Sequence, residues 1–174
     1  MKIVQENQDV VISDFNEVEA LQLARKIEDE GIKFYLKAAE IVENPEVKKA
    51  FKELAKEEEK HVSLFSGMLE KIIKEKNLEI EANSGAEERF FDFIDPKIFG
   101  EIFELEKIVN NINTDINAVE LGEDAEVNSI NFYKALLKNT ESEESKKIIK
   151  DIIKEEQKHL KTLVRYRDVL EKCK

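Results

Sequence analysis

The chain contains two histidines, and each one ends the same short motif. Glu58 lies three residues before His61, and Glu156 lies three residues before His159. On a helix, side chains three residues apart point about 60° apart, so a Glu and a His can bind the same ion. Carboxylate and imidazole groups together are ligands for iron, manganese and zinc. The spacing therefore predicts two pairs of metal ligands, one in each half of the sequence.

An internal repeat relates the two motifs. His159 follows His61 by 98 positions. The same offset relates further pairs, namely Glu28 with Glu126 and Tyr35 with Tyr133. Self-similarity at a fixed offset indicates a duplicated structural unit. The simplest interpretation is a duplicated helical hairpin.

Apolar residues recur at alternating steps of four and three in each half, which is typical of an amphipathic helix that faces a partner. In the first half a helix begins after Asn16 or Asp14, and Asn44-Pro45 indicates a stop and a restart. In the second half one helix runs from Thr114 to about residue 139, and Thr140 with Glu143 predicts a capping box for the next. We therefore expect two hairpins, at about 15–76 and 114–172.

Residues 77–113 connect the two hairpins and have a less regular pattern, with a short helix expected at about 97–109. If the hairpins pack as one antiparallel bundle, the second and third helices run parallel, and a long crossover must join them. The sequence thus predicts a single all-α domain over residues 1–174. Its predicted fold is a four-helix bundle whose crossover, carrying a short helix, connects helices two and three.

An acid interrupts the apolar row of every expected long helix. An ionisable side chain in a dry core costs several kcal/mol unless it is paired or neutralised. Two divalent cations would balance four carboxylates, and one carboxylate from each half would bridge them. A Glu on each of two helices and a Glu-x-x-His on each of the other two is the ligand set of a dinuclear carboxylate site. The predicted ligands are Glu28, Glu58, His61, Glu126, Glu156 and His159.

A polar core without metal is the competing interpretation of these acids. The repetition of the motif on the core-facing side of two helices favours metal binding over that alternative. The neighbouring residues Glu57, Glu59, Glu155 and Gln157 fall off this side of their helices. We expect them to belong to a solvated surface and to take no part in metal binding.

The composition excludes several classes of function. The chain has 28 Lys and Arg against 39 Asp and Glu, a formal net charge of −11, whereas nucleic-acid binding needs an excess of basic residues. Its single cysteine, Cys173, excludes a disulfide framework and a cysteine-based metal cluster within one chain. Neither a signal peptide nor a stretch long enough to cross a bilayer is visible. We expect no membrane partner and a cytoplasmic location.

Four segments together resemble the rubrerythrin-like branch of the ferritin-like superfamily: EDEGIKFY, LAKEEEKHVSLF, EVNSINFYKALL and IIKEEQKHLKTL. The resemblance covers about residues 15–170. It implies a ferritin-like bundle in which the six predicted ligands bind two iron ions, although such a donor set also accepts manganese or zinc. It further implies reduction of hydrogen peroxide or oxygen by the di-ferrous form, in defence against oxidative stress.

The sequence departs from the typical rubrerythrin pattern in two respects. Typical rubrerythrins carry a rubredoxin-like domain with two Cys-x-x-Cys pairs, whereas this chain has one cysteine, so an external electron donor is expected. Typical rubrerythrins also place a Glu three residues after the ligand on the third helix, where this chain has Ser129. Glu123, one turn in the other direction, is a candidate substitute for that carboxylate.

Tyr35 and Tyr133 lie two turns from Glu28 and Glu126 on the same helix faces. A catalytic tyrosine would either bond its hydroxyl to a ligand carboxylate or act as a redox-active side chain. The alternative is an aromatic residue of the core whose hydroxyl is satisfied elsewhere.

Three functions remain open on the sequence. The first is a redox enzyme, a di-iron peroxidase or oxidase. The second is a protein that binds or handles iron without turnover. The third is an interaction bundle with a structural metal or none. The expected assembly is a homodimer, either antiparallel or with helices exchanged between chains through the long crossover.

Overall fold

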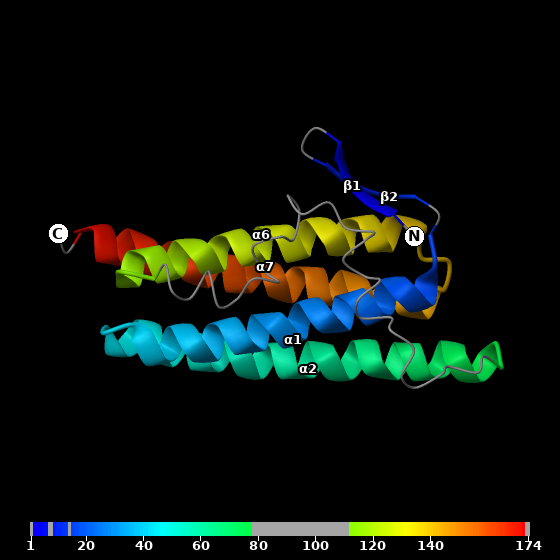
Figure 1. The fold of residues 1–174 in the computed structure, drawn as a ribbon, viewed down its shortest axis with the longest axis horizontal. Coiled ribbons are helices and arrows are strands. Elements are labelled where there is room, and N and C mark those ends of the chain that lie inside the picture. The colour runs from blue at the N-terminus through cyan, green and yellow to red at the C-terminus, as the bar shows by residue number, and fades with distance from the viewer. Residues whose placement is uncertain (1, 7–8, 14, 78–111, 173–174) are drawn as a thin grey trace.

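The computed structural model describes residues 2–6, 9–13, 15–77 and 112–172. This part of the chain contains four long helices: α1 (Glu17–Ile41), α2 (Pro45–Glu75), α6 (Asp115–Asn139) and α7 (Glu143–Lys172). Two short strands, β1 (Lys2–Glu6) and β2 (Asp9–Ser13), precede them (Figure 1). The short helix expected in the crossover and Cys173 lie outside the described residues.

Side-chain caps fix the starts of three helices at the predicted places. The Asn16 side chain accepts hydrogen bonds from the backbone of Val18 and Glu19 at the start of α1. Asn44 caps α2 in the same way, with a proline at the first helical position, and Thr114 caps α6. Each cap satisfies backbone N–H groups that have no partner inside the helix.

The start of α7 differs from the predicted capping box. Thr140 ends α6 instead, because its hydroxyl donates to the Leu136 carbonyl at 2.9 Å. Ser142 takes the capping position, since its Oγ accepts from the N–H of Ser145 at 3.3 Å. The prediction of a Thr140 cap is therefore wrong. Threonine and serine are both favoured at this position, and Thr140 and Ser142 both lie just before α7.

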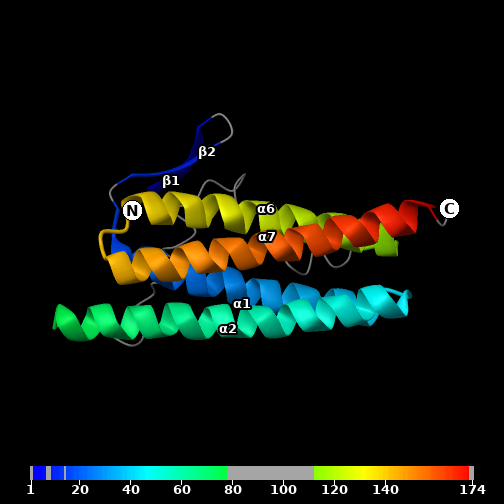
Figure 2. The ribbon, with the colours of Figure 1, turned by 180° about the vertical axis from the view of Figure 1, so that it is seen from behind.

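The helices form two antiparallel hairpins, α1 with α2 and α6 with α7, which pack together through α1 against α6 and α2 against α7 (Figures 1 and 2). α2 and α6 run in the same direction, so α2 ends at the end of the bundle opposite to the start of α6. Asp115 joins the hairpins, because its carboxylate oxygens accept the backbone N–H groups of Glu43 and Asn44, both at 2.8 Å. The predicted four-helix bundle with a long crossover is confirmed.

The helix boundaries follow the repeat. α1 and α6 each span 25 residues, and their first residues, 17 and 115, are 98 positions apart. α2 and α7 span 31 and 30 residues and begin at positions 45 and 143, which have the same separation. Equivalent residues therefore occupy equivalent places in the two hairpins.

Two apolar clusters fill the bundle. One includes Phe65 and Phe132, and the other includes Phe34 and Phe51. Every long helix contributes residues to both clusters. The predicted acids lie between the two clusters along each helix, as on α2, where they lie between Phe51 and Phe65. A charged layer thus divides the core. Of the helices in the described ranges, none is both long and apolar enough to span a membrane.

A short β-hairpin precedes the bundle and was not predicted. β1 and β2 pair antiparallel, from Lys2 opposite Ser13 to Glu6 opposite Asp9, and β2 packs against α6. Ile12 is buried in the apolar cluster that contains Phe65 and Phe132. The apolar run around it, residues 10–12, is too short to give a periodic signal, which is why the sequence analysis missed the hairpin.

Candidate metal centre

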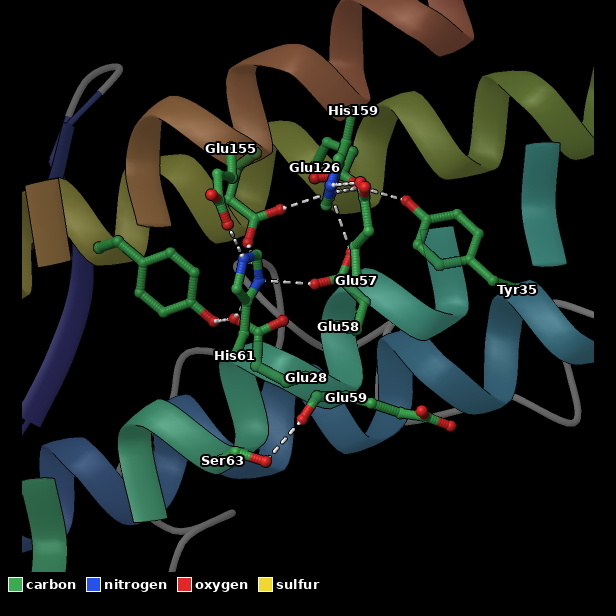
Figure 3. Close-up of polar contacts among 12 residues, drawn as sticks. Glu28, Tyr35, Glu57, Glu58, Glu59, His61, Ser63, Glu126, Glu155 and His159 are labelled. Atoms are coloured by element: carbon green, nitrogen blue, oxygen red, sulfur yellow. Dashed lines mark hydrogen bonds and ion pairs between the residues drawn. The ribbon is translucent and has the colours of Figure 1, made fainter. Parts of the chain in front are cut away.

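The charged layer of the core contains the six ionisable side chains that the sequence singled out. α1 and α6 each supply one Glu, and α2 and α7 each supply a Glu-x-x-His (Figure 3). None of the six is more than 3% exposed. The structure brings all of them together: Glu28, Glu58, His61, Glu126, Glu156 and His159.

The six side chains divide into two overlapping groups of four. Glu28 and His61 complete one group, and Glu126 and His159 complete the other. Glu58 and Glu156 belong to both, and within each group one ligand atom per residue lies within 4.8 Å of all the others. Each group therefore offers three carboxylates and one imidazole. The shared residues come one from each hairpin, so each half contributes one carboxylate that lies in both groups.

Each histidine turns its Nδ1 toward the carboxylates. Nδ1 of His61 lies 2.9 Å from Glu58 and 2.8 Å from Glu156. Nδ1 of His159 lies 3.1 Å and 3.2 Å from the same two residues. The two rings stack with centroids 5.8 Å apart. Nδ1 is therefore the histidine atom that faces the candidate metal positions in both halves.

The electrostatics of the layer reflect its burial. Burial raises the pKa values of Glu28 and Glu126 well above the ordinary carboxyl value, and nearby carboxylates add to the rise. Burial opposes charge on the histidines, but hydrogen bonds to the surrounding carboxylates outweigh it and raise the pKa values of His61 and His159. Despite burial, bonds to the two histidines lower the pKa of Glu156. The carboxylates thus favour the charged form of both histidines, and the histidines favour the charged form of Glu156.

The donor set fits a pair of cations. Oε1 of Glu156 and Nδ1 of His159 are buried, and the ion pairs that they make with neighbouring side chains at 2.8–3.2 Å are poorly aligned as hydrogen bonds. Metal ions between the carboxylates and the histidines would satisfy both atoms. Oxygen and imidazole donors in this number suit iron, manganese and zinc.

Tyr35 and Tyr133 reach the charged layer from opposite hairpins. The Tyr35 hydroxyl donates to Oε1 of Glu126, and the Tyr133 hydroxyl donates to Oε1 of Glu28. Burial and the neighbouring carboxylates raise the pKa values of both tyrosines. Each hydroxyl therefore keeps its proton and donates it in a hydrogen bond to a candidate ligand. The bonded carboxylate lies in the other hairpin, not on the tyrosine's own helix.

Glu57 and Glu155 have half-exposed side chains, as expected for a surface, but each of them also contacts a histidine of the site, which was not predicted. Oε2 of Glu155 lies 3.0 Å from Nε2 of His61, and Oε2 of Glu57 lies 2.7 Å from Nε2 of His159 (Figure 3). Both acids point toward the neighbouring helix, which periodicity along a single helix does not identify. The neighbours Glu59 and Gln157 are exposed, as expected.

Comparisons with known proteins agree with this arrangement. The rubrerythrin family model matches residues 19–166, which is most of the chain. The chain belongs to the rubrerythrin family. This membership and the buried Glu/His cluster together support metal binding at the charged layer.

Two solved structures share the fold of this rubrerythrin-family chain. A crystal structure from Thermotoga maritima, of a protein described as a ferritin-like diiron-carboxylate protein, has a TM-score of 0.63 and 22% identity, covering 88% of this chain and 95% of that chain. A hypothetical protein from Pyrococcus furiosus has a TM-score of 0.58 and 22% identity, covering 92% of this chain and 94% of that chain. No curated protein gave a significant match.

The position at which this rubrerythrin-family chain departs from the typical pattern, Ser129, is buried. Ser129 is 8% exposed, and its equivalent in the other hairpin, Gly31, borders Glu58, where an added Cβ would lie 3.7 Å from Cγ. Glu123 does not replace the missing carboxylate. It accepts a hydrogen bond from Arg167 at 2.7 Å and belongs to neither group of candidate ligands. The structure thus gives no support to Glu123 as the candidate substitute.

Proposed function

We propose that the charged layer holds two iron ions and that the protein reduces hydrogen peroxide or oxygen, in defence against oxidative stress. The observation that carries this proposal is the sharing of Glu58 and Glu156 between two complete groups of four donors. A site for one ion needs only one such group. The duplicated arrangement would offer two ions matching sets of donors, with Glu58 and Glu156 available to both.

The chain's residues divide the binding task by position. Glu28 and His61 would hold one ion, Glu126 and His159 would hold the other, and the two shared carboxylates would contact both. Four carboxylates balance the charge of two divalent cations. Two ferrous ions so bound would supply the two electrons that, with two protons, convert one hydrogen peroxide molecule into two water molecules.

The surroundings keep this chemistry away from bulk water. Fully buried aromatic rings flank the layer on both sides, with Phe51 in one apolar cluster and Phe65 in the other. Tyr35 and Tyr133 hold their protons at carboxylate oxygens within the layer. Such fixed hydrogen bonds orient the ligands and tune their basicity.

Electrons for repeated turnover must reach the iron from outside the chain. The sequence has one cysteine and no Cys-x-x-Cys pair, so it offers no iron–sulfur relay of its own. We therefore propose an external reductant as a partner. That donor would supply two electrons for each peroxide molecule consumed.

Anaerobic titration with ferrous iron, followed by stopped-flow mixing with hydrogen peroxide, tests the proposal. We expect binding to saturate at about two ions per chain and peroxide to oxidise both ions rapidly. With excess reductant, consumption of peroxide should continue for many equivalents. Saturation at less than one ion per chain would overturn the dinuclear site.

A protein that binds iron without turnover is the second candidate. The buried Ser129, where typical rubrerythrins have a carboxylate, favours it, because Glu123 does not supply the missing group. In that case the protein binds two ferrous ions, but peroxide consumption stops after one equivalent even with excess reductant. The same experiment therefore distinguishes the two functions.

A further inference from the structure

Each candidate histidine ligand is held on its outer side by an acid from the opposite hairpin. Nε2 of His61, on α2, lies 3.0 Å from Oε2 of Glu155, on α7. Nε2 of His159, on α7, lies 2.7 Å from Oε2 of Glu57, on α2. The histidines are buried, whereas the acid side chains are 47% and 49% exposed. These two acids therefore connect the protein surface to the buried layer.

The two contacts share one geometry, which indicates that they are a specific feature of the site. The two bonds use the same atoms and are related by the 98-residue repeat, so the same geometry occurs twice in one chain. Each acid directly precedes a shared carboxylate, and it is turned about 100° from it around the helix, toward the facing helix. A solvated acid needs no such partner, as the exposed Glu59 shows.

We propose that Glu57 and Glu155 are positioning residues for the metal site, an inference that rests on the proposed metal binding. A carboxylate bonded to Nε2–H keeps the proton on Nε2, fixes the plane of the ring and leaves Nδ1 free to bind an ion. It also makes the imidazole a stronger ligand. The acids would not touch the metal, but they would set the direction from which each histidine meets it.

The contacts cross between hairpins, and this gives the proposal a specific consequence. Glu155 is four residues from His159 in sequence, but its contact is with His61. Loss of Glu155 should therefore weaken binding of the ion held by His61 and Glu28. Binding of the ion held by His159 and Glu126 should keep its affinity. Loss of Glu57 should have the opposite effect, weakening binding only of the ion held by His159 and Glu126.

Cobalt binding to the full chain tests this inference. We would titrate wild-type protein, Glu155→Ala, Glu155→Gln and the surface control Glu59→Gln with Co²⁺ alone, in competition with a chelator. Wild-type protein and Glu59→Gln should each bind two ions, and their affinities should be the same. Glu155→Ala should lose about 10-fold or more in affinity for one ion. Glu155→Gln should recover part of this loss, because its amide oxygen can still accept from Nε2.

A second readout identifies which histidine is affected. In zinc-loaded wild-type protein, both imidazole Nε2–H protons should exchange slowly and be visible by NMR. Glu155→Ala should remove the His61 signal and keep the His159 signal, an effect that a loss of general stability would not produce. Combined with His61→Asn, Glu155→Ala should weaken binding no further, whereas with His159→Asn it should add its full effect.

The outcomes separate this inference from the proposed function. If wild-type protein binds no Co²⁺, the proposed metal site fails and the inference falls with it. If wild type binds two ions and Glu155→Ala matches Glu59→Gln, the metal site stands and the positioning role is overturned. Loss of the His159 signal in place of the His61 signal would also overturn it. If Glu155→Ala does not fold, Glu155→Gln decides, with several-fold weaker binding than Glu59→Gln expected.

Discussion

In the α1–α2 hairpin, Arg25 is exposed and Leu69 is buried, whereas the equivalent positions of α6–α7 hold Glu123 and Arg167, which form an ion pair at 2.7 Å. At the charged layer the two hairpins show no such divergence. There, each supplies a Glu and a Tyr from its first helix and a Glu-Glu-x-x-His run from its second.

The difference follows from where the partners lie. Tyr133 bonds Glu28 and Glu155 bonds His61, and the repeat supplies the two reverse contacts. Every one of these bonds joins one hairpin to the other. A change in one half therefore removes a contact from the other half as well. The Glu123–Arg167 pair lies within one hairpin, where a pair can change without consequence for the opposite half.

Replacing a shared carboxylate should have the largest effect and should be equal in the two hairpins. We expect Glu58→Gln and Glu156→Gln each to lose at least one of the two ions, because a neutral amide is a poor ligand and both ions use the carboxylate. Elemental analysis after anaerobic reconstitution with ferrous iron measures this, with Glu59→Gln as the matched control. Two ions retained by either variant would contradict the shared role.

Removing the metal should destabilise both hairpins together. Two sites each filled at 100 times their dissociation constant contribute about 5 kcal/mol of binding free energy, which corresponds to about 10 °C or more in Tm for a chain of this size. Calorimetry of the loaded and the chelator-treated protein measures the shift. An unchanged Tm after stripping a sample shown to hold two ions would separate metal binding from folding.

Removing a tyrosine hydroxyl should have a smaller effect, again equal in the two halves. Tyr35→Phe and Tyr133→Phe each leave a buried carboxylate oxygen without its donor, which should lower the free energy of unfolding by about 1–2 kcal/mol. Both variants should still bind two ions, since no ligand is lost. Urea unfolding of the metal-free proteins provides the measurement. A loss confined to one variant would show that the two contacts are not equivalent.

The six candidate ligands and the bundle could be predicted because both depend on spacing along single helices. Glu58 and His61 fall on the core-facing side by periodicity, and the repeat supplies their equivalents. An acid in an apolar row is informative on its own, because burial without a partner is too costly.

The remaining features depend on which helices are neighbours. Glu155 matches Glu57 at the 98-residue offset, but its partner becomes recognisable only once α2 faces α7 and brings His61 within reach. Glu123 shows the opposite case, since its position one turn from Glu126 resembles that of a ligand, but Arg167 on α7 engages it. Ile12 lies in a segment too short for periodicity, and its burial against the bundle is a tertiary effect.

Glu123→Gln should have the smallest effect and tests the divergent pair directly. Its partner Arg167 is 32% exposed, so the pair contributes no more than about 1 kcal/mol to the free energy of unfolding.

The pH dependence of stability provides a second test of Glu123. Burial raises the pKa of Glu123 even with Arg167 beside it, so the native state holds this proton more tightly than the unfolded chain does. Wild-type stability should therefore fall relative to Glu123→Gln as the pH rises above the ordinary carboxyl value of 4.5. Urea unfolding of both proteins between pH 4 and pH 7 measures the trend, and both should bind two ions throughout the range in which wild type does. If Glu123→Gln lost metal as Glu126→Gln should, Glu123 would be a ligand, and the two hairpins would differ at the site itself.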